Sequence, residues 1–250
     1  MSIEVVLSKA PAAKPGLRTA LACRAVICAF AATAVLSTNI FLPSLPAIAA
    51  DLRVSSAAVT STITVFLAIF AVGQLIVGPL SDRFGRQKPI LIGLCIFVLG
   101  TIWCAFADDL SGLLIGRSIQ ASGACAVAVL SRAIARDLFD GQALAKTMAS
   151  ITIATAAAPG FSPLVGSALD HFFGWRSEFV FVAVFAICAG AAYAAFVGET
   201  KAASDSSLHP LSIAGTYLGL VRDARFAAPA PVPMRSGAAL SCLRAKASVL

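Results

Sequence analysis

A short charged segment, residues 78–88, separates two long apolar runs, Val59 to Val77 and Pro89 to Ala107. Each run is close to the roughly 20 residues that an α-helix needs to cross the hydrocarbon core of a bilayer. Charged residues between two such runs are typical of a turn that faces water. The pattern therefore predicts a pair of membrane helices joined by a short turn.

The composition of the whole chain also indicates a membrane protein. Hydrophobic residues make up 59% of the 250 residues, charged residues make up 12%, and the mean hydropathy is +0.90. A soluble domain carries about twice that fraction of charge. The net charge of +7 is also seen in nucleic-acid-binding proteins, but in a membrane protein the positions of Lys and Arg matter more than their sum. We therefore expect a lipid bilayer, and no nucleic acid, as a partner.

Six apolar segments are each long enough to cross about 30 Å of hydrocarbon at about 1.5 Å per residue. They predict an all-α bundle of six transmembrane helices at approximately Ala20–Leu42, Val59–Leu80, Pro89–Ala107, Leu110–Ile134, Thr147–Leu169 and Phe179–Val197. The expected organisation is a cytoplasmic tail (residues 1–19), the bundle (20–198), a cytoplasmic linker (199–226) and an atypical tail rich in proline and alanine (227–250).

Basic residues are distributed unevenly between the two ends of these segments. Ten of them lie at the N-terminus or in the loops after the second and fourth spans, namely Lys9, Lys14, Arg18, Arg24, Arg83, Arg86, Lys88, Arg132, Arg136 and Lys146. Only Arg53 and Arg176 lie on the other side. Because Lys and Arg accumulate in cytoplasmic loops, we expect both termini in the cytoplasm.

A cleaved signal peptide is an alternative interpretation of the first apolar segment. The residues Ala47-Ile48-Ala49 resemble a small-residue cleavage site. The apolar stretch is, however, too long for a signal peptide, and Pro43 and Pro46 interrupt the approach to the site. We therefore interpret this segment as the first transmembrane helix.

Neither a metal site nor an enzyme is indicated. The seven cysteines lie almost all inside the apolar segments without metal-ligand spacing, so we interpret them as packing residues. Ala121-Ser122-Gly123 resembles the serine segment of rhomboid intramembrane proteases, which pair that serine with a histidine in the sixth span. The sixth span here contains no histidine, so Ser122 lacks a base and we expect no catalytic residue.

The charged segment GPLSDRFGRQK, residues 78–88, resembles the loop between helices 2 and 3 of the major facilitator superfamily of secondary transporters. The resemblance implies a conformational latch that stabilises one end-state of alternating access, formed by Gly78, Asp82, Arg83, Gly85 and Arg86. Gly85 would permit a tight turn because glycine tolerates positive φ. Asp82 would lie near a helix N-terminus and the arginines on acidic partners. The alternative is a solvated loop that only carries positive charge.

Further segments are similar to the bicyclomycin/chloramphenicol (Bcr/CflA) branch of the drug:proton antiporters. They are STNIFLPSLPAI (37–48), LIGRSIQASG (114–123), PGFSPLVGS (159–167) and GWR (174–176), and the resemblance extends from about Ile27 to Phe226. It implies the N-terminal half of a twelve-helix drug-efflux transporter of the bacterial inner (plasma) membrane, with no cofactor and with the proton gradient as its energy source. A metabolite or sugar permease of the same superfamily and a transport-inactive membrane fragment are the alternatives.

The resemblance also implies which residues form the substrate or proton pathway. An arginine inside a membrane helix costs about 2.5–3.5 kcal/mol on insertion scales, so Arg117 should face a protein or water-filled interior. Gln120 lies on the same helix face at i+3. In the resembling family this arginine is implicated in proton coupling. We expect Asn39, Gln74, Arg117 and Gln120 to face the cavity.

Asn39 departs from the family, which generally has a membrane-embedded aspartate at this position. The carboxylates nearest to the six spans all lie at their ends, and they are Asp108, Asp109, Asp170, Glu178 and Glu199. A proton-coupled cycle needs a group that binds and releases a proton within the membrane. The sequence of this half therefore supplies no evident proton site.

Small residues and two prolines mark the fifth span. Pro159, Pro163, Gly166 and Ser167 match the antiporter motif of the family, in which Ser167 replaces a second glycine. Small residues let membrane helices approach closely, so we expect a packing role.

Two segments at equivalent places suggest an internal repeat. LSDRFGR (80–86) and LDHFFGWR (169–176) both contain Asp, an aromatic residue, Gly and Arg in that order, after the second and fifth spans. A three-plus-three inverted repeat would leave this pattern.

The chain changes character after Phe226. Alternating prolines at positions 229, 231 and 233 cannot sustain a helix, and no further span follows. We expect an incomplete half-transporter with a frameshifted or prematurely ended reading frame, in which Arg117 would lack its full enclosure; a half-size protein that dimerises is the alternative. Its partners would be the bilayer, a drug-like small molecule, and a missing C-terminal half or a second copy.

Overall fold

A computed structural model of the protein describes residues 17–197. Residues 1–16 and 198–250 lie outside the described part, as do the side chains of residues 17–19 and 82. The chain divides into two units, Met1–Ser207 and Leu208–Leu250, and all described residues belong to the first. The predictions for the N-terminal tail, the linker and the proline-rich tail fall wholly or almost wholly on residues that the structure does not describe.

Helices form almost the whole described part of the chain. They are α1 (Leu17–Asn39), α2 (Leu45–Asp51), α3 (Ser56–Phe84), α4 (Gln87–Ala105), α5 (Leu110–Leu138), α6 (Gly141–Phe173) and α7 (Arg176–Phe196). Six of these helices, all except α2, are long and apolar enough to cross a membrane. The predicted all-α bundle with six spans is confirmed, whereas the short helix α2 was not predicted.

The helix ends follow local sequence signals rather than the limits of the apolar runs. Helix α1 ends at Asn39, before the predicted Leu42, because the residue preceding Pro43 is disfavoured in a helix. The side chains of Ser55 and Asp109 accept backbone N–H groups at the starts of α3 and α5. These contacts satisfy donors that a helix N-terminus leaves free, and they fix where both helices begin.

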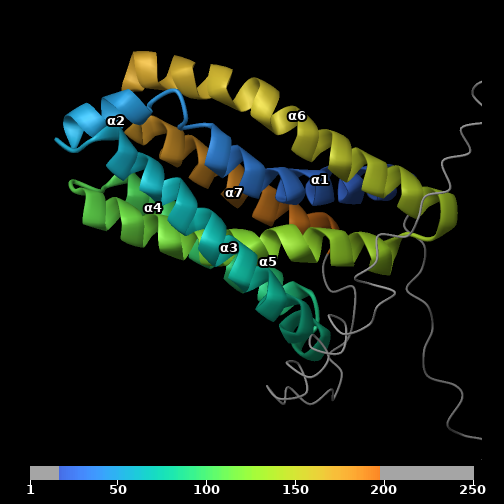
Figure 1. Cartoon of the computed structure of the whole chain (residues 1–250). Helices are drawn as coiled ribbons and strands as arrows, with labels where there is room; N and C mark the ends of the chain where they lie inside the picture. Colours follow the sequence, from blue (N-terminus) through green and yellow to red (C-terminus); the bar gives the residue numbers. More distant parts are fainter. Residues whose placement is uncertain (1–16, 198–250) are drawn as a thin grey trace, which may run out of the picture. The chain divides into compact units, whose positions relative to one another are not determined.

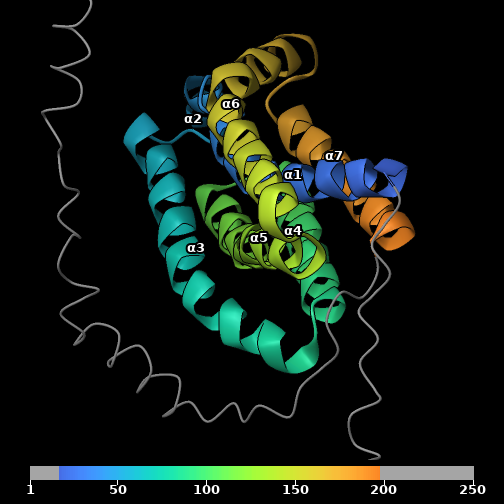
Figure 2. The ribbon, with the colours of Figure 1, turned by 90° about the vertical axis from the view of Figure 1, so that its right-hand side faces the viewer.

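Helix α5 lies at the centre of the bundle, and α3 and α6 lie at its periphery. Of the apolar span of α5, 67% is buried, against 11% for α3 and 17% for α6. Within the described part, α5 shares its largest interface with α4 and also packs against α1 and α3. Figures 1 and 2 show α3 and α6 on the outside of the bundle.

Glycines bring the backbones of α4 and α5 into close contact. A methyl group at Gly123 would overlap the backbone nitrogen of Phe97, and one at Gly100 would overlap the backbone of Gln120. Small residues permit this approach between membrane helices, which are held together by van der Waals packing rather than by a hydrophobic driving force. The position of Gln120 in the bundle therefore depends on Gly100.

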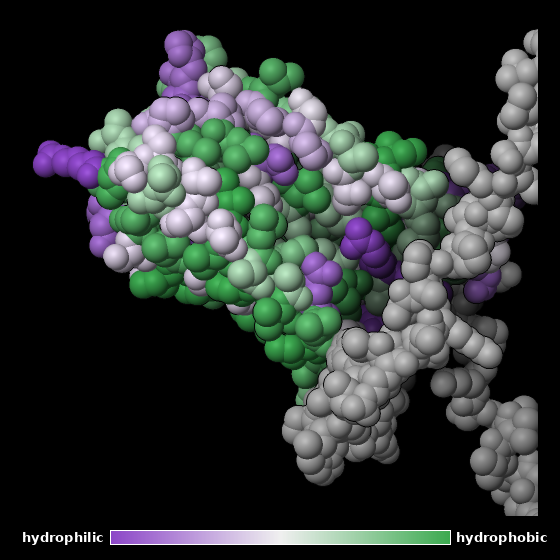
Figure 3. All heavy atoms as spheres, viewed as in Figure 1, coloured by the Kyte–Doolittle hydropathy of each residue, from purple (hydrophilic) through white to green (hydrophobic). Residues whose placement is uncertain are grey.

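The outer surface of the bundle is largely apolar. Figure 3 shows apolar side chains over much of one face, with strongly hydrophilic ones at its left end and a few more toward its right side. Several helices expose large apolar side chains, for example Ile76 of α3, Ile92 of α4, Leu164 of α6 and Val184 of α7. Such a surface suits lipid, in which helices satisfy their backbone hydrogen bonds internally.

We predict that Gly123→Ala destabilises the bundle. The added methyl group meets backbone atoms of Phe97, which cannot yield as the end of a flexible side chain would, so we expect an overpacking cost of about 1–3 kcal/mol. Gly160→Ala is the matched control because nothing lies within 4 Å of its added methyl group. Thermal denaturation of the detergent-solubilised chain measures both variants, and a wild-type midpoint for Gly123→Ala would contradict the packing.

Candidate functional site

A buried arginine on α5 is the centre of the candidate site. The side chain of Arg117 is fully buried (0% exposed). Its Nη1 donates hydrogen bonds to the backbone oxygen of Ser37 in α1, at 3.0 Å, and to Oε1 of Gln120, at 2.6 Å. Gln120, also fully buried, donates from Nε2 to Oγ1 of Thr101 in α4, at 2.8 Å. These hydrogen bonds join α1, α4 and α5.

Three aromatic rings enclose the guanidinium group. Its Cζ atom lies 4.2 Å from the ring centroid of Phe41, 4.7 Å from that of Phe66 and 6.0 Å from that of Phe179. A cation over an aromatic face is attracted by the ring quadrupole, and more strongly when it is desolvated. We call the whole set the Arg117 network, and its residues are Ser37, Phe41, Phe66, Thr101, Arg117, Gln120 and Phe179.

Arg117 retains hydrogen-bonding capacity that no described residue uses. Its Nε and Nη2 atoms have no partner in the described part of the chain. Among the described residues, no carboxylate forms an ion pair with it. Burying a charge without a counter-ion is costly, and the aromatic rings offset only part of that cost. The two nitrogens are therefore available to an acceptor that the described residues do not supply.

Arg117 faces a protein interior, as its insertion cost predicts, whereas the structure differs from the prediction that Arg117 and Gln120 face a cavity. The two side chains do share one face of α5, as the i+3 spacing predicts. That face is packed inside the bundle, where both side chains are 0% exposed. The expectation that Arg117 lacks its enclosure without a second half is also wrong, because the aromatic rings of this half enclose it.

The other two residues of the predicted pathway do not join the network. Asn39 is half-buried, and its Nδ2 donates to the backbone oxygen of Val35 within α1, at 2.7 Å. Gln74 is exposed on α3. Neither residue forms a hydrogen bond with Arg117 in the described part of the chain. The structure therefore brings together two of the four predicted residues.

The predicted latch segment forms the turn between α3 and α4. Gly85 has φ of +83°, the left-handed conformation expected there. Nε of Arg86 forms an ion pair with Oδ2 of Asp137 in α5 at 2.9 Å, and its Nη1 donates to Oγ of Ser81 at 2.5 Å. Arg86 thus has the acidic partner that was expected for the arginines of this segment.

The remaining latch residues are less constrained. Arg83 is exposed, with its Cζ 5.4 Å from the ring centroid of Phe84. A methyl group at Gly78 would meet nothing within 4 Å. The backbone of Asp82 lies in the last turn of α3, at the opposite end from the N-terminus of that helix, and its side chain is not described.

A second charged cluster lies at the other end of the bundle, which we call the α2 end. Nη1 of Arg176 in α7 lies 2.7 Å from Oδ2 of Asp51, and its Nη2 lies 3.3 Å from Oδ1 of Asp108. The indole N–H of Trp175 also donates to Asp51, at 3.1 Å. The hydrogen bond from Arg176, and to a lesser extent the one from Trp175, lowers the pKa of Asp51 below its usual value. Asp51 therefore stays ionised, and keeps its contact with Arg176, at every pH above the usual pKa of an aspartate. The contact is lost only when the pH falls further, through the lowered pKa of Asp51.

The two charged turns have equivalent geometry, as the repeated pattern in the sequence suggests. Gly85 has φ of +83° and Gly174 has φ of +78°, each at the end of a long helix. Each glycine is followed closely by an arginine that pairs with an aspartate of another helix, Arg86 at one end and Arg176 at the other. Figure 1 shows the C-terminal ends of α3 and α6, where these two glycines lie, at opposite ends of the bundle.

The fifth-span motif packs at one position only. Helix α6 is longer than the predicted span and continues through Pro159 and Pro163. A methyl group at Gly166 would overlap the backbone oxygen of Ile40, so α6 approaches the end of α1 closely there. Ser167 is exposed, and most of the small-residue face is not covered in the described part of the chain.

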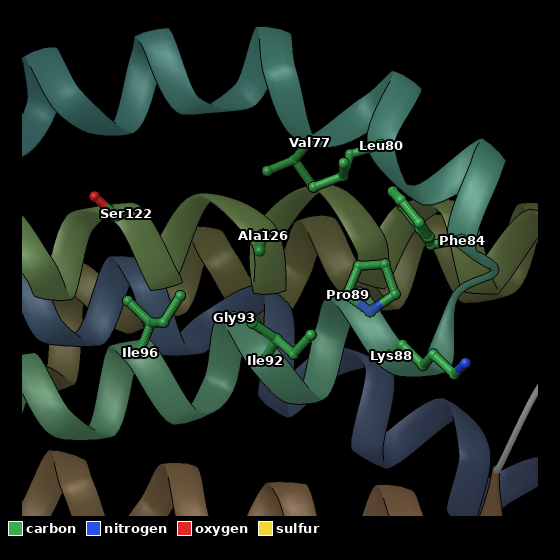
Figure 4. A pocket seen from close by; sticks show the side chains of 10 residues that line it. All are labelled: Val77, Leu80, Phe84, Lys88, Pro89, Ile92, Gly93, Ile96, Ser122 and Ala126. Atoms are coloured by element: carbon green, nitrogen blue, oxygen red, sulfur yellow. The ribbon is translucent and has the colours of Figure 1, made fainter. Parts of the chain in front are cut away.

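A pocket of about 340 Å³ lies between α3, α4 and α5. Figure 4 shows Val77, Leu80 and Phe84 on α3 facing α4, with the ammonium group of Lys88 pointing away from the pocket. Oγ of Ser122, at the far end, donates to the backbone of its own helix at 2.9 Å. Because no polar groups converge in it, this pocket is a weaker candidate for a specific site than the Arg117 network.

Sequence reasoning missed a second buried ionisable group. Glu178 was assigned to the end of the sixth span, but its side chain is fully buried and accepts a hydrogen bond from Oγ of Ser44. A signal was present, because Glu178 directly precedes the apolar run of α7. The three aromatic rings around Arg117 were also missed, since their contacts join residues far apart in the chain.

Residues 27–244 match the Major Facilitator Superfamily, and the chain belongs to this family. The resemblance was expected to stop at Phe226, but the matched range extends beyond it.

The relatives of this chain include bacterial transporters and resistance proteins. The uncharacterized MFS-type transporter YdgK of Bacillus subtilis is 41% identical over 146 residues, which are 58% of this chain and 36% of YdgK. A bicyclomycin resistance protein homolog of Haemophilus influenzae is 34% identical over 162 residues, which are 65% of this chain and 41% of that protein. The chain thus spans less than half the length of these relatives.

Among solved structures, the peptide transporter POT in complex with sulfate matches with a TM-score of 0.67 and 13% identity. The match covers 83% of this chain and 45% of that chain. At this identity the likeness shows the fold alone. Together with the six apolar helices, it identifies the chain as an integral membrane protein with a transporter fold.

We predict that Arg117 and Gln120 are energetically coupled. Gln120→Leu removes an acceptor and leaves the buried guanidinium less satisfied, at an expected cost of about 1–3 kcal/mol. In Arg117→Met with Gln120→Leu the charge is absent too, so much of that loss should be recovered.

Thermal denaturation of the wild type, both single variants and the double variant measures this coupling. Ser118→Ala is the control, because its hydroxyl bonds only to the backbone of α5. Additive effects of the two single changes would contradict the network.

Proposed function

We propose that this chain is the N-terminal half of a drug-efflux transporter that exchanges a drug-like small molecule for protons. The observation that carries the proposal is the Arg117 network, in which a buried cation at the centre of the bundle has two donor nitrogens without partners among the described residues. The name of the bicyclomycin resistance protein homolog supports drugs as the substrate class. A metabolite or sugar permease of the same family would need the same bundle and stays the alternative.

Alternating access in this fold is the rocking of one six-helix half against the other around a central site. In this account the pair Arg86–Asp137 holds the α3–α4 turn against α5 in one end-state. Gly78, Asp82, Arg83 and Gly85 belong to the same proposed latch segment as Arg86. Separation of Arg86 from Asp137 accompanies the change to the other end-state.

The substrate is placed between the exposed faces of α3 and α6 and the opposite half. Gln74 contributes from α3, and Asn39 lies beside the network on α1. Arg117 and Gln120 lie beneath this surface. During the cycle, Nε and Nη2 of Arg117, which have no partner among the described residues, donate hydrogen bonds to a carboxylate or to a negatively charged group of the substrate. Gly166 lets α6 pack closely on the segment at the end of α1. Pro159, Pro163 and Ser167 of the same motif are assigned to packing of α6 against the opposite half.

The proposed setting is the bacterial inner membrane, with both termini in the cytoplasm. The basic residues of the α3–α4 and α5–α6 turns then face the cytoplasm, and the α2 end faces outward. The missing wall of the cavity is supplied by a C-terminal half or, in the alternative, by a second copy of the chain.

We predict that residues 1–250 expressed alone do not lower the dye content of cells, because the cavity has only one wall. The same chain fused to the C-terminal half of the Haemophilus relative should export dye, and Arg117→Met in that fusion should not. Dye retention with and without a proton uncoupler measures efflux, and immunoblots of membranes control for protein levels.

Energy-dependent efflux by residues 1–250 alone would contradict the two-half account and support the dimer. Absence of efflux from the unmodified fusion at normal membrane levels would contradict drug efflux itself.

A further inference from the structure

A carboxyl group is buried at the α2 end of the bundle. Glu178 lies in the first turn of α7, and its side chain is 0% exposed. Oγ of Ser44, which is also 0% exposed, donates to Oε1 of Glu178. Oε2 has no hydrogen-bond partner in the described part of the chain. Among the described residues, the hydroxyl of Ser44 is therefore the only hydrogen-bond partner of this carboxyl group.

Within residues 17–197, none of the charged groups around Glu178 forms an ion pair with it. Arg176, two residues earlier, is engaged by Asp51 of α2 and by Asp108 between α4 and α5. Asp170, near the end of α6, is within electrostatic reach and carries the same sign of charge. Arg117 of α5 faces the ring of Phe179, the residue that follows Glu178 in α7. Among the described residues it forms no ion pair with Glu178. The surroundings thus offer the ionised carboxyl no described counter-charge.

The neutral acid is the form that these surroundings accommodate. A carboxylate removed from water is unstable unless cations or several donors compensate for the lost hydration. The N-terminus of α7 favours an anion, but this effect is smaller than the cost of desolvation. The neutral acid can still accept the hydrogen bond from Ser44 at Oε1 and carry its proton on Oε2.

We infer that Glu178 is a proton-binding site of this half and is protonated in this conformation. It supplies the buried carboxyl group that the first helix lacks, where Asn39 stands. On release the Oε2–H bond breaks, its electron pair stays on the carboxylate, and the proton passes to water. Water reaches Oε2 when the corner between α1 and α2, which carries Ser44, separates from α7. The use of this proton in transport rests on the proposed efflux function.

Infrared spectroscopy of the chain reconstituted in lipid tests the site without any transport assay. At neutral pH the exposed carboxyl groups are ionised, so Glu178 should contribute a protonated-carboxyl C=O band that shifts to lower frequency in D2O. Glu178→Gln should abolish this band. Asp170→Asn is the control, because it removes the neighbouring carboxyl and should leave the band in place.

Ser44→Ala tests the site with the carboxyl retained, should Glu178→Gln fail to accumulate. Loss of the hydrogen bond to Oε1 should move the same band to higher frequency. The inference is overturned if the wild type has no such band at neutral pH, or if the band is unchanged in Glu178→Gln or, where that variant is not obtained, in Ser44→Ala.

The coupling role is tested in the fusion with a C-terminal half. Glu178→Gln should flatten the pH dependence of efflux, whereas Asp170→Asn should not. An unchanged pH profile in Glu178→Gln would overturn the coupling role while the infrared band stands. Absence of efflux from the unmodified fusion would count against the efflux proposal. The proton site would then be judged by the infrared band alone.

Discussion

One buried guanidinium ties most of this bundle together. Arg117 bonds to the backbone of α1 and, through Gln120, to α4, while aromatic rings from α3, α7 and the end of α1 surround it. An unpaired cation in a membrane interior is expensive. Each of these helices must therefore keep its position to keep the hydrogen bonds and ring contacts that partly stabilise the charge. The glycines at the α4–α5 interface permit the close approach that places Gln120 beside Arg117.

The remaining helices are held differently. Helices α3 and α6 have most of their spans uncovered in the described part of the chain. In the proposed transporter, these exposed faces are the ones assigned to packing against a second half or a second copy. Ion pairs at the two ends of the bundle, Arg86 with Asp137 and Arg176 with Asp51, close turns of equivalent geometry. Being at helix ends, these pairs can break and reform with less rearrangement than the central network. In the proposed function, this combination of a tightly held centre and separable ends suits a half that rocks against its partner.

The sequence predicts the spans and the turns because their signals are local. Apolar runs of the length of a membrane helix, the charged segment around Gly85 and the spacing of Arg117 and Gln120 each lie within a few turns of chain. The aromatic rings around Arg117 and the burial of Glu178 were missed, because they depend on contacts between residues far apart in sequence. Helix α2 was missed although Pro46 in its first turn is a local start signal. The surroundings of Arg117 were likewise predicted only in part. The i+3 spacing of Arg117 and Gln120 shows that both lie on one helix face, but it does not show which residues cover that face.

Hydrogen exchange of the purified chain tests the central claim, that the Arg117 network holds the core of this half. With mass spectrometry of the detergent-solubilised chain, the backbone amides of α5 and α4 should exchange most slowly and those of α3 and α6 fastest, because local opening follows contact and burial. Gln120→Leu should speed exchange in α1, α4 and α5 together. Uniform protection across all six long helices, or an effect of that variant confined to α5, would contradict the account.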